Sequence, residues 1–255
     1  IENHVNFSCE ASVGGGIPIL MPLHQSLAAN QIESIVSIVN GTTNYILSQM
    51  TETGVNYANA LADAQKQGFA EADPTNDVCG FDAARKLAIL SSIGFRANVT
   101  FDDVLVEGIE KIDKSDIQYA KDMGYTIKLL TVALRQENGI ALNVYPAFLP
   151  DNHPLSSVKG AYNAIYVTGN IVDDVMFYGR GAGALPTASA VMGDVISTAQ
   201  HILNGSTGTG MIMTDTKRIP FYSSLKLQNS YYFRLDVDDV TGVPVSYTHL
   251  RAHET

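Results

Sequence analysis

The sequence predicts an α+β fold in which helices cover a mixed, largely antiparallel sheet. Two pairs of segments rich in Val, Ile and Tyr are each joined by a short polar turn, which is typical of β-hairpins. Around them, apolar residues recur every three or four positions, which is typical of helices that bury one face. Hairpins imply antiparallel pairing, and the helices then supply a layer beside the sheet.

Each element is assigned from local signals. Strands are expected at 31–39, 126–135, 140–148, 162–167 and 172–177, with the second and third joined at Glu137-Asn138-Gly139. Helices are expected at 17–28, 57–66, 114–123 and 187–203. One more helix should begin at Thr42 or Thr43, whose hydroxyl can cap its first turn, and run to Gln49. Another should begin at Asp77 as N-cap and run to about Ser92.

The expected helix at 187–203 has an apolar stripe that needs burial against another surface. The stripe consists of Val191, Val195, Ile196, Ala199 and Leu203. If no other part of the protein covers it, we expect these side chains to be exposed and the helix to exchange its amide hydrogens early.

The composition is that of a globular protein with a real core, since 45% of the 255 residues are hydrophobic. A formal net charge of -10 argues against nucleic acid as a partner, because phosphate binding needs clustered Lys and Arg. No apolar run approaches the roughly 20 residues that cross a bilayer, and the N-terminus lacks a secretory pattern. With only Cys9 and Cys79 present, we expect two inert thiols and a cytoplasmic protein.

The segment from Gly68 to Lys86 has the strongest concentration of chemically active side chains. Asp82 and Lys86 are four residues apart on the expected helix, so their charges can meet, and Glu71 and Asp77 can converge on the same pocket. A solvated surface pair and a plain helix cap would give the same spacing. Many neighbours of Lys86 are apolar, however, and a partly buried lysine beside a carboxylate is a candidate proton donor.

Four blocks, in this order, resemble the homoserine dehydrogenase family. They are Glu10-Ala11-Ser12-Val13-Gly14-Gly15-Gly16-Ile17-Pro18, Asn40-Gly41-Thr42-Thr43-Asn44-Tyr45-Ile46, the segment 68–86, and Gly179-Arg180-Gly181-Ala182-Gly183 with Pro186-Thr187. The resemblance covers roughly residues 3 to 235, and four ordered blocks are much harder to match by chance than one motif. It implies NAD(P)-dependent interconversion of L-homoserine and L-aspartate 4-semialdehyde in threonine and methionine biosynthesis.

The resemblance also implies a role for individual residues. Lys86 would be the catalytic acid and base. Glu71 and Asp82, and with them Asp77, would bind the substrate, whose ammonium group suits carboxylates. Gly68 and Gly183 would approach the dinucleotide, because glycine lets backbone amides come near. A monovalent cation, usually sodium, would be held at Glu10, Val13, Gly15 and Ile17, although a structural loop with a capping Glu is the open alternative.

The domain organisation departs from the family at both ends. No strand followed by Gly-x-Gly-x-x-Gly occurs, so the N-terminal Rossmann domain is expected to be missing, and with it a second lysine of the active site. Residues 1–203 would form the substrate-binding and catalytic domain, 204–230 a linker, and 231–245 the truncated start of an ACT domain. Residues 246–255 look like translated cloning sequence.

Two other functions stay open. The chain could be a non-catalytic fragment that dimerises and binds substrate but cannot bind cofactor alone; for the enzyme itself we expect a homodimer or homotetramer. Alternatively, Lys86 could be the Schiff-base nucleophile of a lyase or aldolase, because a lysine among acids suits that chemistry too.

Overall fold

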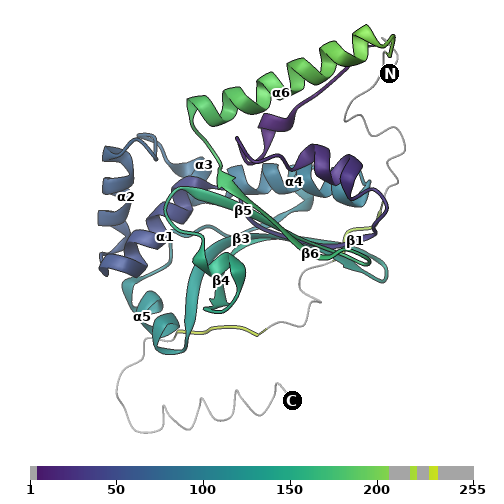
Figure 1. The fold of residues 1–255 in the computed structure, drawn as a ribbon. Helices are drawn as coiled ribbons and strands as arrows, with labels where there is room; N and C mark the ends of the chain where they lie inside the picture. Colours follow the sequence, from purple (N-terminus) through teal and green to yellow (C-terminus); the bar gives the residue numbers. More distant parts are fainter. Residues whose placement is uncertain (1–4, 207–218, 223–229, 235–255) are drawn as a thin grey trace, which may run out of the picture.

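The computed structural model describes residues 5–206, 219–222 and 230–234 (Figure 1). Its six-stranded sheet has the order β2-β4-β3-β1-β5-β6, and every pairing is antiparallel except that of β2 with β4. The strands are β1 (Ile32–Ile38), β2 (Leu105–Val106), β3 (Tyr125–Gln136), β4 (Gly139–Pro150), β5 (Tyr162–Gly169) and β6 (Asp173–Arg180). The α+β class, the mixed sheet and both hairpins are thus confirmed.

The expected tail at 246–255 lies outside the described residues, as does 235–245 of the expected ACT segment.

The helices gather mainly on one side of the sheet (Figure 1). They are α1 (Gly41–Thr53), α2 (Tyr57–Lys66), α3 (Thr75–Val78), α4 (Phe81–Phe95), α5 (Lys114–Asp122) and α6 (Ala184–Leu203). Short helical turns occur at η1 (Glu10–Ser12), η2 (Pro22–Ser26), η3 (Phe101–Asp103) and η4 (Pro154–Ser157). Within the described segments, no helix is long and apolar enough to cross a membrane.

Alternation along β3 divides the interior into two unequal clusters. Ile127, Leu129 and Ala133 face α1 and α4 and belong to the large cluster. Leu130 and Val132 point to the other face, where the smaller cluster is completed by Leu155 of η4. The large cluster therefore fixes α1 and α4 on the sheet, and these two helices carry most of the candidate site described below.

Three predicted helix boundaries were wrong. The N-cap of α1 is Asn40 rather than Thr42 or Thr43, because its side chain accepts the amide of Thr43. Asp77 lies inside the short helix α3, and α4 begins only after Gly80, whose φ of 83° breaks the helical path. The region expected to be helical at 17–28 contains only a short helical segment, with the π-helical turn η2 at Pro22–Ser26.

Two glycine-rich loops that are far apart in the sequence pack directly against each other. The amide of Gly16 donates to the carbonyl of Arg180 at 3.1 Å. A Cβ at Gly15 would come within 2.4 Å of the Gly181 carbonyl oxygen, and a Cβ at Gly16 within 2.7 Å of Pro186. Glycine is required here because no side chain fits between the two backbones.

The first described residues lie beside α6 and the residues that follow it. The Asn6 amide Nδ2 donates to the carbonyl of Ser206 at 3.5 Å, and the backbone amide of Glu10 donates to Asp194 Oδ2 of α6 at 2.9 Å. The start of the described chain thus lies beside the end of α6, while later residues return to the sheet, where the amide of Tyr222 donates to the carbonyl of Ile140.

Candidate functional site

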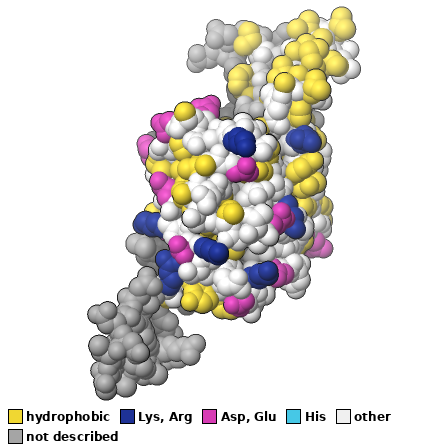
Figure 2. All heavy atoms as spheres, turned by 90° about the vertical axis from the view of Figure 1, so that its left-hand side faces the viewer, with side chains coloured by type: hydrophobic (Ala, Val, Ile, Leu, Met, Phe, Trp, Pro, Cys, Tyr) yellow, Lys and Arg dark blue, Asp and Glu magenta, His cyan; other side chains and the backbone are white. Residues whose placement is uncertain are grey.

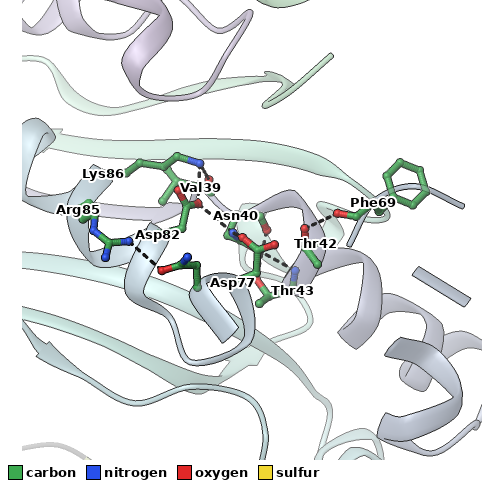
Figure 3. A network of polar contacts seen from close by, with 10 residues as sticks. Val39, Asn40, Thr42, Thr43, Phe69, Asp77, Asp82, Arg85 and Lys86 are labelled. Carbon is green, nitrogen blue, oxygen red and sulfur yellow. Dashed lines mark hydrogen bonds and ion pairs between the residues drawn. The ribbon is translucent and has the colours of Figure 1, made fainter. Parts of the chain in front are cut away.

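Lys86 lies on α4 with its ammonium group held between a carboxylate and a backbone carbonyl (Figure 3). Nζ donates to Asp82 Oδ2 at 2.7 Å and to the carbonyl oxygen of Val39 at 3.0 Å. The Lys86 side chain is 22% exposed and that of Asp82 31%, so the pair is partly buried, as the apolar surroundings of Lys86 predicted. An ammonium group held in a partly desolvated place can give a proton to a bound molecule and take it back.

Asn40 joins this pair to a second carboxylate. Its amide Nδ2 donates to Asp82 Oδ2 at 2.9 Å and to Asp77 Oδ1 at 2.7 Å. Figure 3 shows Asn40 between the two aspartates, with Lys86 beyond Asp82. Asn40 itself is only 4% exposed, and its Oδ1 caps α1 through Thr43, so its orientation is fixed. Asp77, Asp82 and Lys86 are therefore brought together, as predicted.

The left-handed residue Gly80 makes this convergence possible. It ends α3 and begins α4, so Asp77 and Asp82 approach Asn40 from two different helices. A Cβ at Gly80 would lie 3.1 Å from Val106 and 3.2 Å from Val144, so the turn packs closely on β2 and β4. A non-glycine residue would be strained here in both conformation and space.

Glu71 lies in the loop between α2 and α3, and its side chain is exposed. The loop is tied to the start of α1 because Thr42 Oγ1 donates to the carbonyl oxygen of Phe69 at 2.6 Å (Figure 3). Within the described residues, the Glu71 carboxylate accepts no hydrogen bond; its backbone carbonyl accepts one from Gln65. The structure therefore brings the Glu71 loop to the site through Thr42, without a direct contact between Glu71 and Asp82.

Gly68 and Gly183 both adopt conformations that favour glycine, with φ values of 76° and 121°. A Cβ at Gly68 would meet nothing within 4 Å, and one at Gly183 would meet only Pro186. A side chain at Gly68 would thus point into open space, whereas one at Gly183 would be in ordinary contact with Pro186.

The loop of the first block has an acidic residue whose two carboxylate oxygens both accept backbone hydrogen bonds. Glu10 accepts hydrogen bonds from the amides of Ile19, Leu20 and Met21, so its side chain caps the helical segment that follows the loop. The residues Val13, Gly15 and Ile17 are buried, yet their carbonyl oxygens accept no hydrogen bond from the described part of the chain. These carbonyls, rather than the Glu10 carboxylate, are the groups available to a cation.

Two important residues were missed at the level of sequence. For Asn40 we expected no capping or functional role of its own, although an Asn before a helix is a common N-cap and could have been recognised as one. Lys128 of β3 is 2% exposed, and burial lowers its pKa to about 8. The sequence indicated its burial only weakly, because alternation along a strand does not show which face of the sheet is covered.

Comparison with known proteins gives a consistent result. A family model described as homoserine dehydrogenase matches residues 18–196. The chain is 45% identical to a homoserine dehydrogenase of Corynebacterium glutamicum over 245 residues, and 44% identical to one of Bacillus subtilis over 241 residues. Each match covers 94% of this chain but 55% of the relative. The chain thus spans about half the length of the curated relatives that it matches.

Solved structures agree with the sequence comparisons. A homoserine dehydrogenase from Thiobacillus denitrificans superposes with a TM-score of 0.81 at 41% identity, over 84% of this chain and 50% of that one. A hyperthermophilic archaeal homoserine dehydrogenase in complex with NADPH superposes with a TM-score of 0.66 at 28% identity, over 78% of this chain and 57% of that one. The fold, the matched region and the identity lead to one conclusion: this chain belongs to the homoserine dehydrogenase family.

Proposed function

We propose that this chain is the substrate-binding and catalytic part of an enzyme that interconverts L-homoserine and L-aspartate 4-semialdehyde with NAD(P). The observation that carries the proposal is the arrangement of Lys86, Asp82, Asn40 and Asp77, which lies within the residues matched by the family model. The arrangement supplies a proton donor beside two carboxylates, which is what reduction of an aldehyde on an ammonium-bearing substrate requires.

The carboxylates have acceptor capacity left for a substrate. Asn40 binds one oxygen of each aspartate, while Asp77 Oδ2 and Asp82 Oδ1 accept no hydrogen bond within the described residues. In our proposal these oxygens, together with the exposed Glu71, receive the ammonium group of the substrate. Asp82 also holds Lys86 in place, so substrate binding and proton transfer share one carboxylate.

A bound nicotinamide cofactor supplies or accepts the hydride in this reaction. Lys86 delivers a proton to the aldehyde oxygen, or removes one from the hydroxyl in the reverse direction. The open space beside Gly68 and the left-handed backbone of Gly183 fit contacts between backbone amides and the cofactor, and the archaeal relative is a complex with NADPH. A Rossmann domain would hold most of the cofactor, so the chain alone should bind it poorly.

A monovalent cation, most simply sodium, fits the first glycine loop. Val13, Gly15 and Ile17 are buried residues whose carbonyl oxygens lack donors within the described residues, and hard cations prefer oxygen ligands. Nearby, a Cβ at Gly181 would overlap Asn163, whose buried Oδ1 accepts no hydrogen bond in the described structure. Because the Glu10 carboxylate caps a helical segment, we propose that Glu10 binds the cation through its backbone carbonyl oxygen.

The activity is tested with the completed enzyme, by which we mean this chain joined behind a dinucleotide-binding domain of the family. Homoserine-dependent reduction of NAD(P)+ is expected, and the 255-residue chain alone should show none. Glu71→Gln and Asp82→Asn should each raise KM for homoserine by about tenfold or more, since each removes a charge-assisted contact. Glu137→Gln, an exposed change in the β3–β4 turn, is the matched control.

The two alternatives predict different results. A completed enzyme that binds NAD(P) but never reduces it with homoserine would favour a non-catalytic binding fragment. Borohydride trapping of a carbonyl substrate on Lys86 would favour the lyase or aldolase. A homodimer or homotetramer and a cytoplasmic location remain predictions, and sedimentation of the completed enzyme would decide the first.

A further inference from the structure

Lys128 is a buried cation to which the described part of the chain gives no carboxylate partner. Within the described residues its Nζ donates to Asn44 Oδ1 at 3.0 Å and to the carbonyl oxygen of Val158, and it forms no ion pair. Removing a lysine from water is costly, and replacing such a group by a well-packed apolar one is often neutral or stabilising. Stability alone therefore gives little reason for a lysine at this place.

The ammonium group fixes how the Asn44 side chain is turned. An ammonium group can only donate, so Oδ1 of Asn44 must face it and Nδ2 must point the other way. Nδ2 there donates to the carbonyl oxygens of Val158, Gly160 and Tyr162 at 3.2, 2.9 and 3.1 Å. One helical turn later, Ser48 Oγ accepts the amide of Gly160 at 3.1 Å. The first two turns of α1 are thus clamped to the loop before β5.

The clamped turn of α1 is the one that carries Asn40. The backbone amide of Asn44 donates to the carbonyl oxygen of Asn40 at 3.3 Å, and the side chain of Asn40 holds Asp77 and Asp82. A continuous series of hydrogen bonds therefore runs from Lys128 through Asn44 and Asn40 to Asp82 and Lys86. A shift of α1 along this series would move the Asn40 amide relative to both carboxylates.

We propose that Lys128 is a positioning residue for the substrate site, which it holds in register through Asn44 and Asn40. This role rests on the proposed function, because it gives the buried lysine a purpose only if the two aspartates bind substrate. Its effect is on binding geometry, since Lys128 is too deeply buried to touch a substrate. Losses of this kind are large for small displacements, because charged contacts depend on exact placement.

A double-mutant cycle in the completed enzyme tests the role. Lys128→Met keeps the length of the side chain and removes its donors, and Asn40→Ala removes the bridge between the aspartates. We expect Lys128→Met alone to raise KM for homoserine by about tenfold with a smaller change in kcat. In the Asn40→Ala background the same substitution should cause almost no further rise, because its route to the site is gone. Lys121→Met, on an exposed position of α5, should change neither value.

Several outcomes would overturn the proposal. An unchanged KM in Lys128→Met, or an equal rise in both backgrounds, would mean that Lys128 does not act through Asn40. A lower Tm with normal KM would show a purely structural role. If Lys128→Met does not fold, Ser48→Ala replaces it in the cycle, because it weakens the same clamp; a rise of about twofold that vanishes beside Asn40→Ala would support the proposal. A parent enzyme without homoserine turnover would instead refute the proposed function itself.

Discussion

The layered interior and the projecting helix α6 contain similar apolar sequences, but these are buried in the interior and exposed in α6. In α4, Leu87 and Leu90 are 0% exposed because they pack between the helix and the sheet. In α6, Val195 and Ile196 are 51% and 56% exposed, and no residue of the helix is buried. Figure 2 shows hydrophobic side chains gathered at the top of the molecule, where Figure 1 places α6. An apolar stripe thus predicts that a helix has a surface to bury, but not which partner covers it.

The largest expected effect is the loss of turnover when Lys86 of α4 is replaced, which tests whether the catalytic residue lies in the layered region. In the completed enzyme, Lys86→Ala should lower kcat by about 10²- to 10⁴-fold, with a much smaller change in KM, because a proton donor acts mainly in the transition state. Steady-state kinetics measure both values, and Lys66→Ala in the exposed end of α2 is the control. Near-normal turnover would remove Lys86 from its catalytic role.

Stability should differ sharply between the two helices. Leu87→Ala in α4 should lower the free energy of unfolding by about 2–5 kcal/mol, since it leaves a cavity in the core. Val195→Ala in α6 should change it by less than about 0.5 kcal/mol, because the side chain is half exposed. Urea denaturation of the chain gives both values. Similar losses would mean that α6 is covered in solution.

Hydrogen exchange offers a direct comparison of the two helices. In the isolated chain, backbone amides at 187–203 should exchange about tenfold faster or more than those at 81–92, because few packed side chains hold α6. Mass spectrometry of peptides from each helix measures the rates. Equal protection in a monomeric chain would contradict the picture of an uncovered α6, whereas protection that depends on concentration would indicate self-association.

A pH-dependent effect on stability is expected from Lys128, the buried lysine of β3. Burial lowers the pKa of Lys128 from 10.5 to about 8, so between these values the unfolded chain binds more protons than the folded one. The stability of the folded chain should therefore rise with pH across this window, by up to about 1.4 kcal/mol per pH unit from this group. Lys128→Met should lose that slope in denaturation curves, and an unchanged slope would show that other groups cause it.

The sequence predicted more of the sheet than of the helix boundaries. Hairpin strands were placed well because the two-residue turn Glu137-Asn138 and the alternation fix register locally. The break at Gly80 was missed because the apolar, alanine-rich stretch has the pattern of one continuous helix. Glycine is required there by close packing against Val106 and Val144, which is a tertiary contact. Lys86, Asp82 and Asp77 could be grouped because they are close in sequence. The hydrogen bonds from Asn40 to the two aspartates could not be predicted, because Asn40 is distant in sequence and reaches them only through the tertiary fold.

The contact between Asn6 and Ser206 has a practical consequence for protein engineering. Because Asn6 and Ser206 are neighbours, residues 5–206 can be treated as a cassette with both junctions on one side and the six-stranded sheet wholly inside, although the contacts of Tyr222 with β4 and of Tyr232 with α5 would be lost. Insertions of whole domains succeed best where the ends of the insert lie close together. Grafting residues 5–206 between the two halves of a foreign scaffold should therefore preserve the network around Lys86.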